Sequence, residues 1–60
     1  MNITKLAFKF RDWYNSPDFP EDLEMADVEE TVLAWIDFAE IDLGDNLDAL
    51  CERIVELGIC

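Results

Sequence analysis

Residues 3–14 carry their apolar side chains with the period of an α-helix. At 100° per residue, six apolar residues fall within an arc of about 120°, as a core-facing helix requires: Ile3, Leu6, Ala7, Phe10, Trp13 and Tyr14. A strand is the alternative for residues 3–11, because Leu6, Phe8 and Phe10 alternate with the residues between them. The helix accounts for six apolar positions and the strand for three, so we expect a helix, which Asn2 can cap.

Two further helices are expected, at about residues 28–41 and 46–57. Asp27 begins a capping box with Glu30, and Gly44 is expected to end the helix that follows. Asp45 is expected to cap the last helix, and Gly58 to end it in a Schellman motif. The main apolar face of the second helix is Val28, Val32, Trp35, Ile36 and Ala39, and that of the third is Leu47, Leu50, Cys51, Ile54 and Leu57.

The connections between these segments predict the fold class. Pro17 and Pro20 lie in a strong turn signal that stops a regular helix, and residues 20–23 can form a short helical turn. Short connections between helices favour an all-α fold, a compact three-helix arrangement, in a single small acidic domain of residues 1–60. A strand at 3–11 would make the fold α+β instead.

The composition predicts a folded domain. Of the 60 residues, 52% are hydrophobic, which is too many for a disordered acidic tail. Cys51 and Cys60 would lie about 13 Å apart on a continuous helix, beyond disulfide reach, so reduced thiols are expected. The chain begins without the apolar run of a signal peptide, and no apolar run is long enough to span a membrane. We therefore expect a cytoplasmic protein.

Acidic side chains dominate the charge of the chain. Fifteen Asp and Glu stand against four Lys and Arg, for a net charge of −11, and Arg53 is the one basic residue after Asp12. This charge repels nucleic acid and anionic membranes and attracts basic surfaces at moderate salt. The expected partner is a basic protein surface, with no direct binding to nucleic acid or membrane, and the chain itself is expected to be a monomer or homodimer.

Few residues are suited to catalysis or metal binding. The chain has no histidine, and Ser16 is its only serine, so no nucleophile–histidine pair can form. Calcium loops beginning at Asp37 or Asp42 would place Asp42 or Leu47 where an EF-hand needs glycine. We expect no enzyme activity, no cofactor and no bound metal.

The acidic residues around the last helix align. They occupy an arc of about 80°, rise about 4.5–6 Å from one to the next, and are named here the acidic strip: Asp45, Asp48, Glu52 and Glu56. Phosphates along one DNA strand repeat on a similar scale, about 3.4 Å apart along the duplex axis. The second helix is expected to flank the strip with Glu29, Glu30, Asp37 and Glu40. These eight residues are the predicted partner-binding site, although a solvated face or adaptation to high salt would give the same composition.

In size and charge the chain resembles small acidic inhibitors of phages and mobile elements, including anti-CRISPR and anti-restriction proteins that imitate DNA. The resemblance covers the physical type of the whole chain and includes no shared motif. It implies a non-enzymatic inhibitor, acting in the host cytoplasm, whose carboxylates replace phosphates on a nucleic-acid-binding protein such as a CRISPR effector or restriction enzyme. Two alternatives stay open: an immunity protein or antitoxin that masks a basic toxin, and a small subunit of a larger assembly, for which Phe8, Leu33 and Phe38 off the core faces would form contacts.

Overall fold

The computed structural model describes residues 2–59, and in this range it contains three α-helices and two short 3-10 turns. In chain order these are α1 (Ile3–Tyr14), η1 (Glu21–Leu23), α2 (Val28–Ala39), η2 (Gly44–Asn46) and α3 (Leu47–Glu56). The prediction of an all-α, three-helix arrangement is confirmed. The alternative strand at residues 3–11 is wrong, because the helix buries one apolar face that contains Ala7, Phe10 and Trp13.

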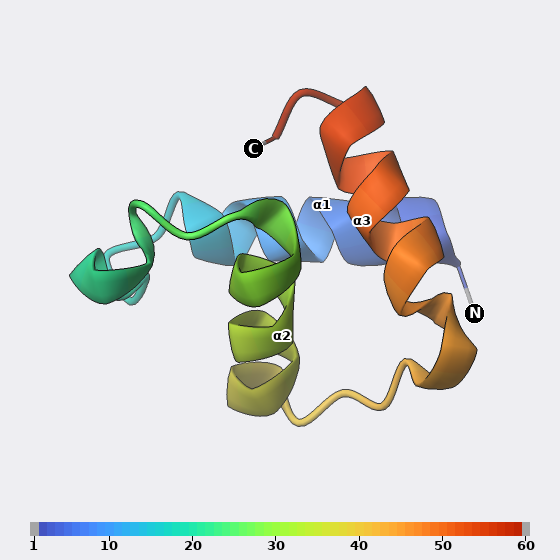
Figure 1. The fold of residues 1–60 in the computed structure, drawn as a ribbon, viewed down its shortest axis with the longest axis horizontal. Coiled ribbons are helices and arrows are strands. Elements are labelled where there is room, and N and C mark those ends of the chain that lie inside the picture. The colour runs from blue at the N-terminus through green and yellow to red at the C-terminus, as the bar shows by residue number, and fades with distance from the viewer. Residues whose placement is uncertain (1, 60) are drawn as a thin grey trace.

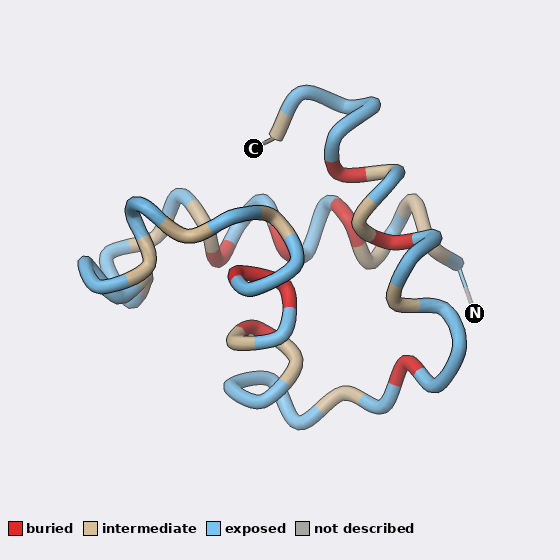
Figure 2. The backbone as a smooth tube through the Cα atoms, viewed as in Figure 1, coloured by how far each residue is buried: buried red, intermediate tan, exposed pale blue. Residues whose placement is uncertain are grey.

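The helices form two layers (Figure 1). α1 is one layer, and α2 and α3 cross it side by side as the other. The buried residues lie on the turns of α2 and α3 that meet α1, and Leu43 is the buried residue of the connection between them (Figure 2). No residue of the segment 15–27 is fully buried, and this loop packs against the core through the partly buried side chains of Phe19 and Leu23.

Aromatic rings form the centre of the core. Phe10 is completely buried, and its ring centroid lies 5.6 Å from that of Trp35 in an edge-to-face contact. Phe19 holds the loop against the end of α1, with its ring 5.0 Å from Trp13 and 4.7 Å from Tyr14. Edge-to-face pairs at these distances stabilise a fold beyond the area they bury, by about 0.5–1.5 kcal/mol each.

Three large apolar side chains lie off the core, as the sequence indicated. Phe8, Leu33 and Phe38 are 41%, 46% and 61% exposed. The Arg11 guanidinium lies 4.9 Å from the centre of the Phe8 ring, within the range of a cation–π contact. Phe38 still contacts the edge of the core, because its ring centroid lies 5.9 Å from that of Trp13.

Capping side chains and a glycine set several helix boundaries where the sequence predicts them. Asn2 Oδ1 accepts a hydrogen bond from the Lys5 amide at 3.0 Å, and Asp27 Oδ1 accepts one from the Glu30 amide at 2.8 Å. Gly58 has φ +71°, and the next amide donates to the Ile54 carbonyl at 3.1 Å. This is the hydrogen bond of a Schellman motif, so both caps and the ending after α3 are confirmed.

The other boundaries differ from the prediction. α2 stops at Ala39, two residues before the expected end, because Glu40 takes the left-handed conformation that closes the helix. Gly44 does not end α2 but begins η2, and Asp45 lies inside this turn and does not cap α3. Asn46 precedes the first residue of α3 without a side-chain cap, because the turn η2 continues directly into the helix. The prediction of reduced thiols stays untested, since Cys60 is outside the described residues.

Replacing Glu40 by glycine is expected to stabilise the domain. Glu40 has φ 56° and ψ 45°, a conformation that costs a residue with a Cβ about 1–2 kcal/mol and costs glycine little. The unfolded chain gains freedom with glycine, so we expect a net increase of about 0.5–1 kcal/mol in the free energy of unfolding, measured by urea denaturation. Glu40→Ala is the control, because it removes the same charge and keeps the Cβ. Equal stabilisation by both variants would show that charge, not backbone strain, is relieved.

Candidate functional site

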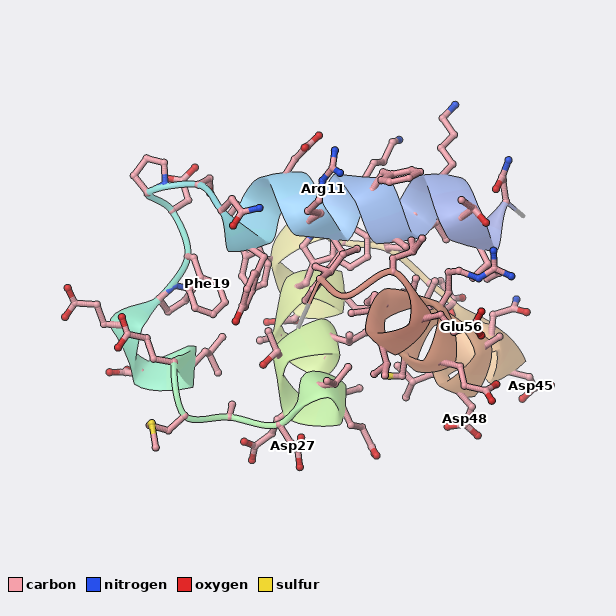
Figure 3. The ribbon with its side chains drawn as sticks, turned by 90° about the horizontal axis from the view of Figure 1, so that it is seen from above. Arg11, Phe19, Asp27, Asp45, Asp48 and Glu56 are labelled. Atoms are coloured by element: carbon pink, nitrogen blue, oxygen red, sulfur yellow. The ribbon has the colours of Figure 1, made fainter. Side chains whose placement is uncertain are left out.

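α3 presents three residues of the acidic strip on one exposed face. Asp48, Glu52 and Glu56 follow one another at intervals of four residues, so their side chains stack along the helix about 6 Å apart. Asp45 lies in η2 and is exposed on the same side of the molecule as Asp48 (Figure 3). Like charges spaced four apart on a helix repel each other by about 0.2–0.5 kcal/mol per pair. This face therefore lacks the alternation of charge that would stabilise an isolated helix.

The outer face of α3 and the start of α2 border a shallow, open groove of about 680 Å³. Its floor, called here the apolar floor, is Val28, Cys51 and Val55. Its rim, called the acidic rim, is Asp27, Glu29, Asp48, Glu52 and Glu56. The groove follows α3 from Asp48 to Glu56, a length of about 12 Å. Carboxylates from two helices thus lie beside apolar side chains on one surface.

The sequence predicted four of the five rim residues and missed the fifth. Asp27 was recognised as the cap of α2, and the structure shows that it also lies on the rim. Only one of its carboxylate oxygens accepts the capping hydrogen bond from the Glu30 amide, so the other remains for a second contact. Val55 was missed as well, although its position carried a signal, because it projects about 20° from Asp48 on the helix. Val55 thus places an exposed apolar side chain within the acidic arc.

The remaining predicted site residues lie apart from the groove. Glu30 and Asp37 are exposed on the outer face of α2, and Glu40 is exposed at its end. Together with Asp45 they are not among the residues that line the groove. They add negative charge around it, and their role as contact residues stays a prediction.

One cation neighbours the rim. Arg53 Nε lies 3.9 Å from Glu56 Oε2, and Arg53 Nη1 donates to Thr4 Oγ1 at 2.8 Å. The ionic distance is much longer than the 2.7–2.9 Å of a charge-assisted hydrogen bond, and both side chains are open to water, so the pair contributes little. Among residues 2–59 no other ion pair is formed. The negative charge of the acidic rim is therefore almost wholly uncompensated by nearby cations.

The other three basic residues occupy the opposite side of the molecule. Lys5, Lys9 and Arg11 are exposed on the outer face of α1, with Asp12 among them. Figure 3 shows Arg11 on the edge opposite to Asp27 and Asp48. The charge of the domain is therefore polarised, and positive charge is attracted toward the groove more than toward α1.

Within residues 2–59 no group of three or more cysteine, aspartate or glutamate side chains is placed to hold a metal ion. The helices found in this range are too short or too polar to cross a membrane.

Comparison with known proteins adds no relative. No protein-family model matches the chain, and neither curated proteins nor solved structures give a match. The functional argument therefore depends on the groove and its charge.

Proposed function

We propose that the chain is a non-enzymatic inhibitor that binds the nucleic-acid-binding surface of a basic protein through the outer faces of α2 and α3. One observation carries the proposal: five carboxylates from two helices line one groove, and Arg53 forms the only ion pair beside them among residues 2–59, a weak one. A surface that served only for solubility would gain nothing from gathering these charges, and it loses stability through their repulsion.

The inhibition is steric and electrostatic. The carboxylates of the acidic strip and the rim pair with the lysine and arginine side chains that otherwise hold phosphates, so nucleic acid is excluded. Attraction between opposite fields makes the association fast and sensitive to salt. A host CRISPR effector or restriction enzyme is the target class that the resemblance to acidic phage inhibitors suggests.

The apolar floor favours a second candidate of a different class. An immunity protein or antitoxin that masks a basic toxin recognises a protein surface in its own right, and apolar contacts at the centre of an interface give such complexes much of their affinity. Val55, which is 56% exposed, offers a contact of this kind. The two candidates differ in whether the masked surface is one that binds nucleic acid.

Capture from a host lysate tests both candidates. The chain is immobilised, incubated with nuclease-treated lysate, and eluted in parallel with a salt gradient and with duplex DNA. We expect a basic protein that elutes at moderate salt and is also displaced by DNA, because both ligands occupy one surface. A captured protein that salt releases and DNA does not would favour toxin masking. Capture of no basic protein would contradict both candidates.

A further inference from the structure

The apolar floor of the groove is unusual for a surface that acts by charge alone. Val55 is 56% exposed, and Val28 and Cys51 are half-buried beside it. Val28 and Cys51 also pack against the core, whereas Val55 is not among the residues that do. Phosphate mimicry requires carboxylates and no apolar surface. The floor therefore indicates a contact that nucleic acid does not make.

The charge of the rim selects the occupant. Five carboxylates around the floor repel nucleic acid, anionic lipid and acidic peptides, and they attract a ligand that carries several positive charges. To contact the apolar floor, the same ligand must also carry apolar side chains between its positive charges. A basic amphipathic helix has this combination, since residues spaced three and four apart share one face. Two such side chains, about 5–6 Å apart, fit within the 12 Å length of the groove.

We propose that the groove binds a basic amphipathic helix of the partner protein. Leucine-sized side chains of that helix contact Val28, Cys51 and Val55, and lysine or arginine side chains on both sides pair with the acidic rim. This inference rests on the proposed function and specifies it: the rim gives affinity for basic surfaces in general, and the floor selects a protein among them.

Two helical peptides test the groove. Both carry the same lysine and arginine residues, and one has two leucines one turn apart where the other has two alanines, which preserve helix propensity and charge. We expect the leucine peptide to bind the full chain at least about tenfold more tightly, as burial of a leucine side chain predicts. In methyl NMR spectra its addition should shift the signals of Val28 and Val55, and leave that of Val32, which is fully buried, nearly unchanged.

A matched pair of variants locates the effect. Val55→Asn removes the apolar contact at the floor, and Leu33→Asn makes the same kind of change at a comparably exposed residue of α2 that does not line the groove. Asparagine and valine have similar helix propensities, so Val55→Asn should keep its fold, which circular dichroism checks. We expect Val55→Asn to abolish the advantage of the leucine peptide and Leu33→Asn to retain it.

The outcomes separate this inference from the proposed function. If both peptides bind equally well, the floor has no role, and the proposed electrostatic inhibition stands without it. If Leu33→Asn abolishes the preference and Val55→Asn does not, the helix docks elsewhere and the groove is excluded. If neither peptide binds at low salt, the acidic surface does not recognise basic helices and this inference fails, whereas the proposed function is decided by the capture from lysate.

Discussion

Replacing Phe10 by alanine is expected to remove a large part of the free energy of unfolding of the domain. Phe10 is fully buried, and its ring lies 5.6 Å from Trp35 and 5.8 Å from both Trp13 and Tyr14. Truncation of a buried phenylalanine costs about 3–5 kcal/mol, because it removes the transfer free energy of the ring and leaves a cavity. A domain of 60 residues has a free energy of unfolding of about 3–9 kcal/mol, so the loss is comparable to the total.

Urea denaturation measures this loss directly. Trp13 and Trp35 both lie in the core, so tryptophan fluorescence follows its disruption, and circular dichroism follows the helices in the same samples. Phe8→Ala is the matched control on the same helix, where the ring is 41% exposed and contacts Arg11. We expect it to cost about 1 kcal/mol or less, since it removes a surface contact.

The pair also tests the conformation of residues 3–11. Phe8 and Phe10 would lie on the same face of a strand, and both would be buried or exposed together. On a helix they lie about 160° apart, so when one side chain faces the core the other faces solvent. Equal destabilisation by the two alanine variants would therefore contradict the packing of α1.

Helical periodicity made the fold predictable, and helix boundaries were predictable where a single side chain decides them. Asn2, Asp27 and Gly58 act within one turn of their own position, so their roles follow from local sequence. The end of α2 did not follow, because glutamate has no local preference for the left-handed conformation that Glu40 adopts. The direct passage of η2 into α3 likewise depends on Leu43, which is buried in the core and fixes the path of the connection.

The acidic strip could be predicted from the sequence, and the groove could not. Asp48, Glu52 and Glu56 belong to one helix, so their alignment follows from its period. Asp27 and Glu29 reach the same groove from α2, and only the packing of α2 beside α3 brings them there. Tertiary contacts of this kind are not encoded in any one segment, which is why Asp27 was recognised for its local role alone.

Reversing the charge of Asp48, Glu52 and Glu56 to lysine is expected to weaken binding to a basic partner by about 100-fold or more. Each substitution makes the net charge more positive by two units, so the net charge of the chain changes from −11 to −5. Three favourable contacts with lysine or arginine become repulsive, and a change of about 1 kcal/mol at each weakens the complex by about 100-fold or more. Dissociation constants from calorimetry at moderate salt measure the loss.

The fold of this variant is expected to persist. All three side chains are exposed, and the lower net charge reduces the self-repulsion of the domain. Asp48 lies in the first turn of α3, where a lysine is less favourable by about 0.3–1 kcal/mol, an amount that the reduced repulsion offsets in part. Circular dichroism should therefore give the helix content of the parent chain.

A charge-matched control separates the placement of charge from its total. Asp12, Asp22 and Glu24 are exposed on α1 and around η1 and do not line the groove, and their reversal to lysine also gives a net charge of −5. This control reduces long-range attraction, which screening limits to about 8–10 Å at physiological salt, and it leaves every rim contact in place. We therefore expect it to weaken binding by less than about tenfold. Equal losses in the two triple variants would mean that the partner responds to total charge, and that the groove with its acidic rim is not where it binds.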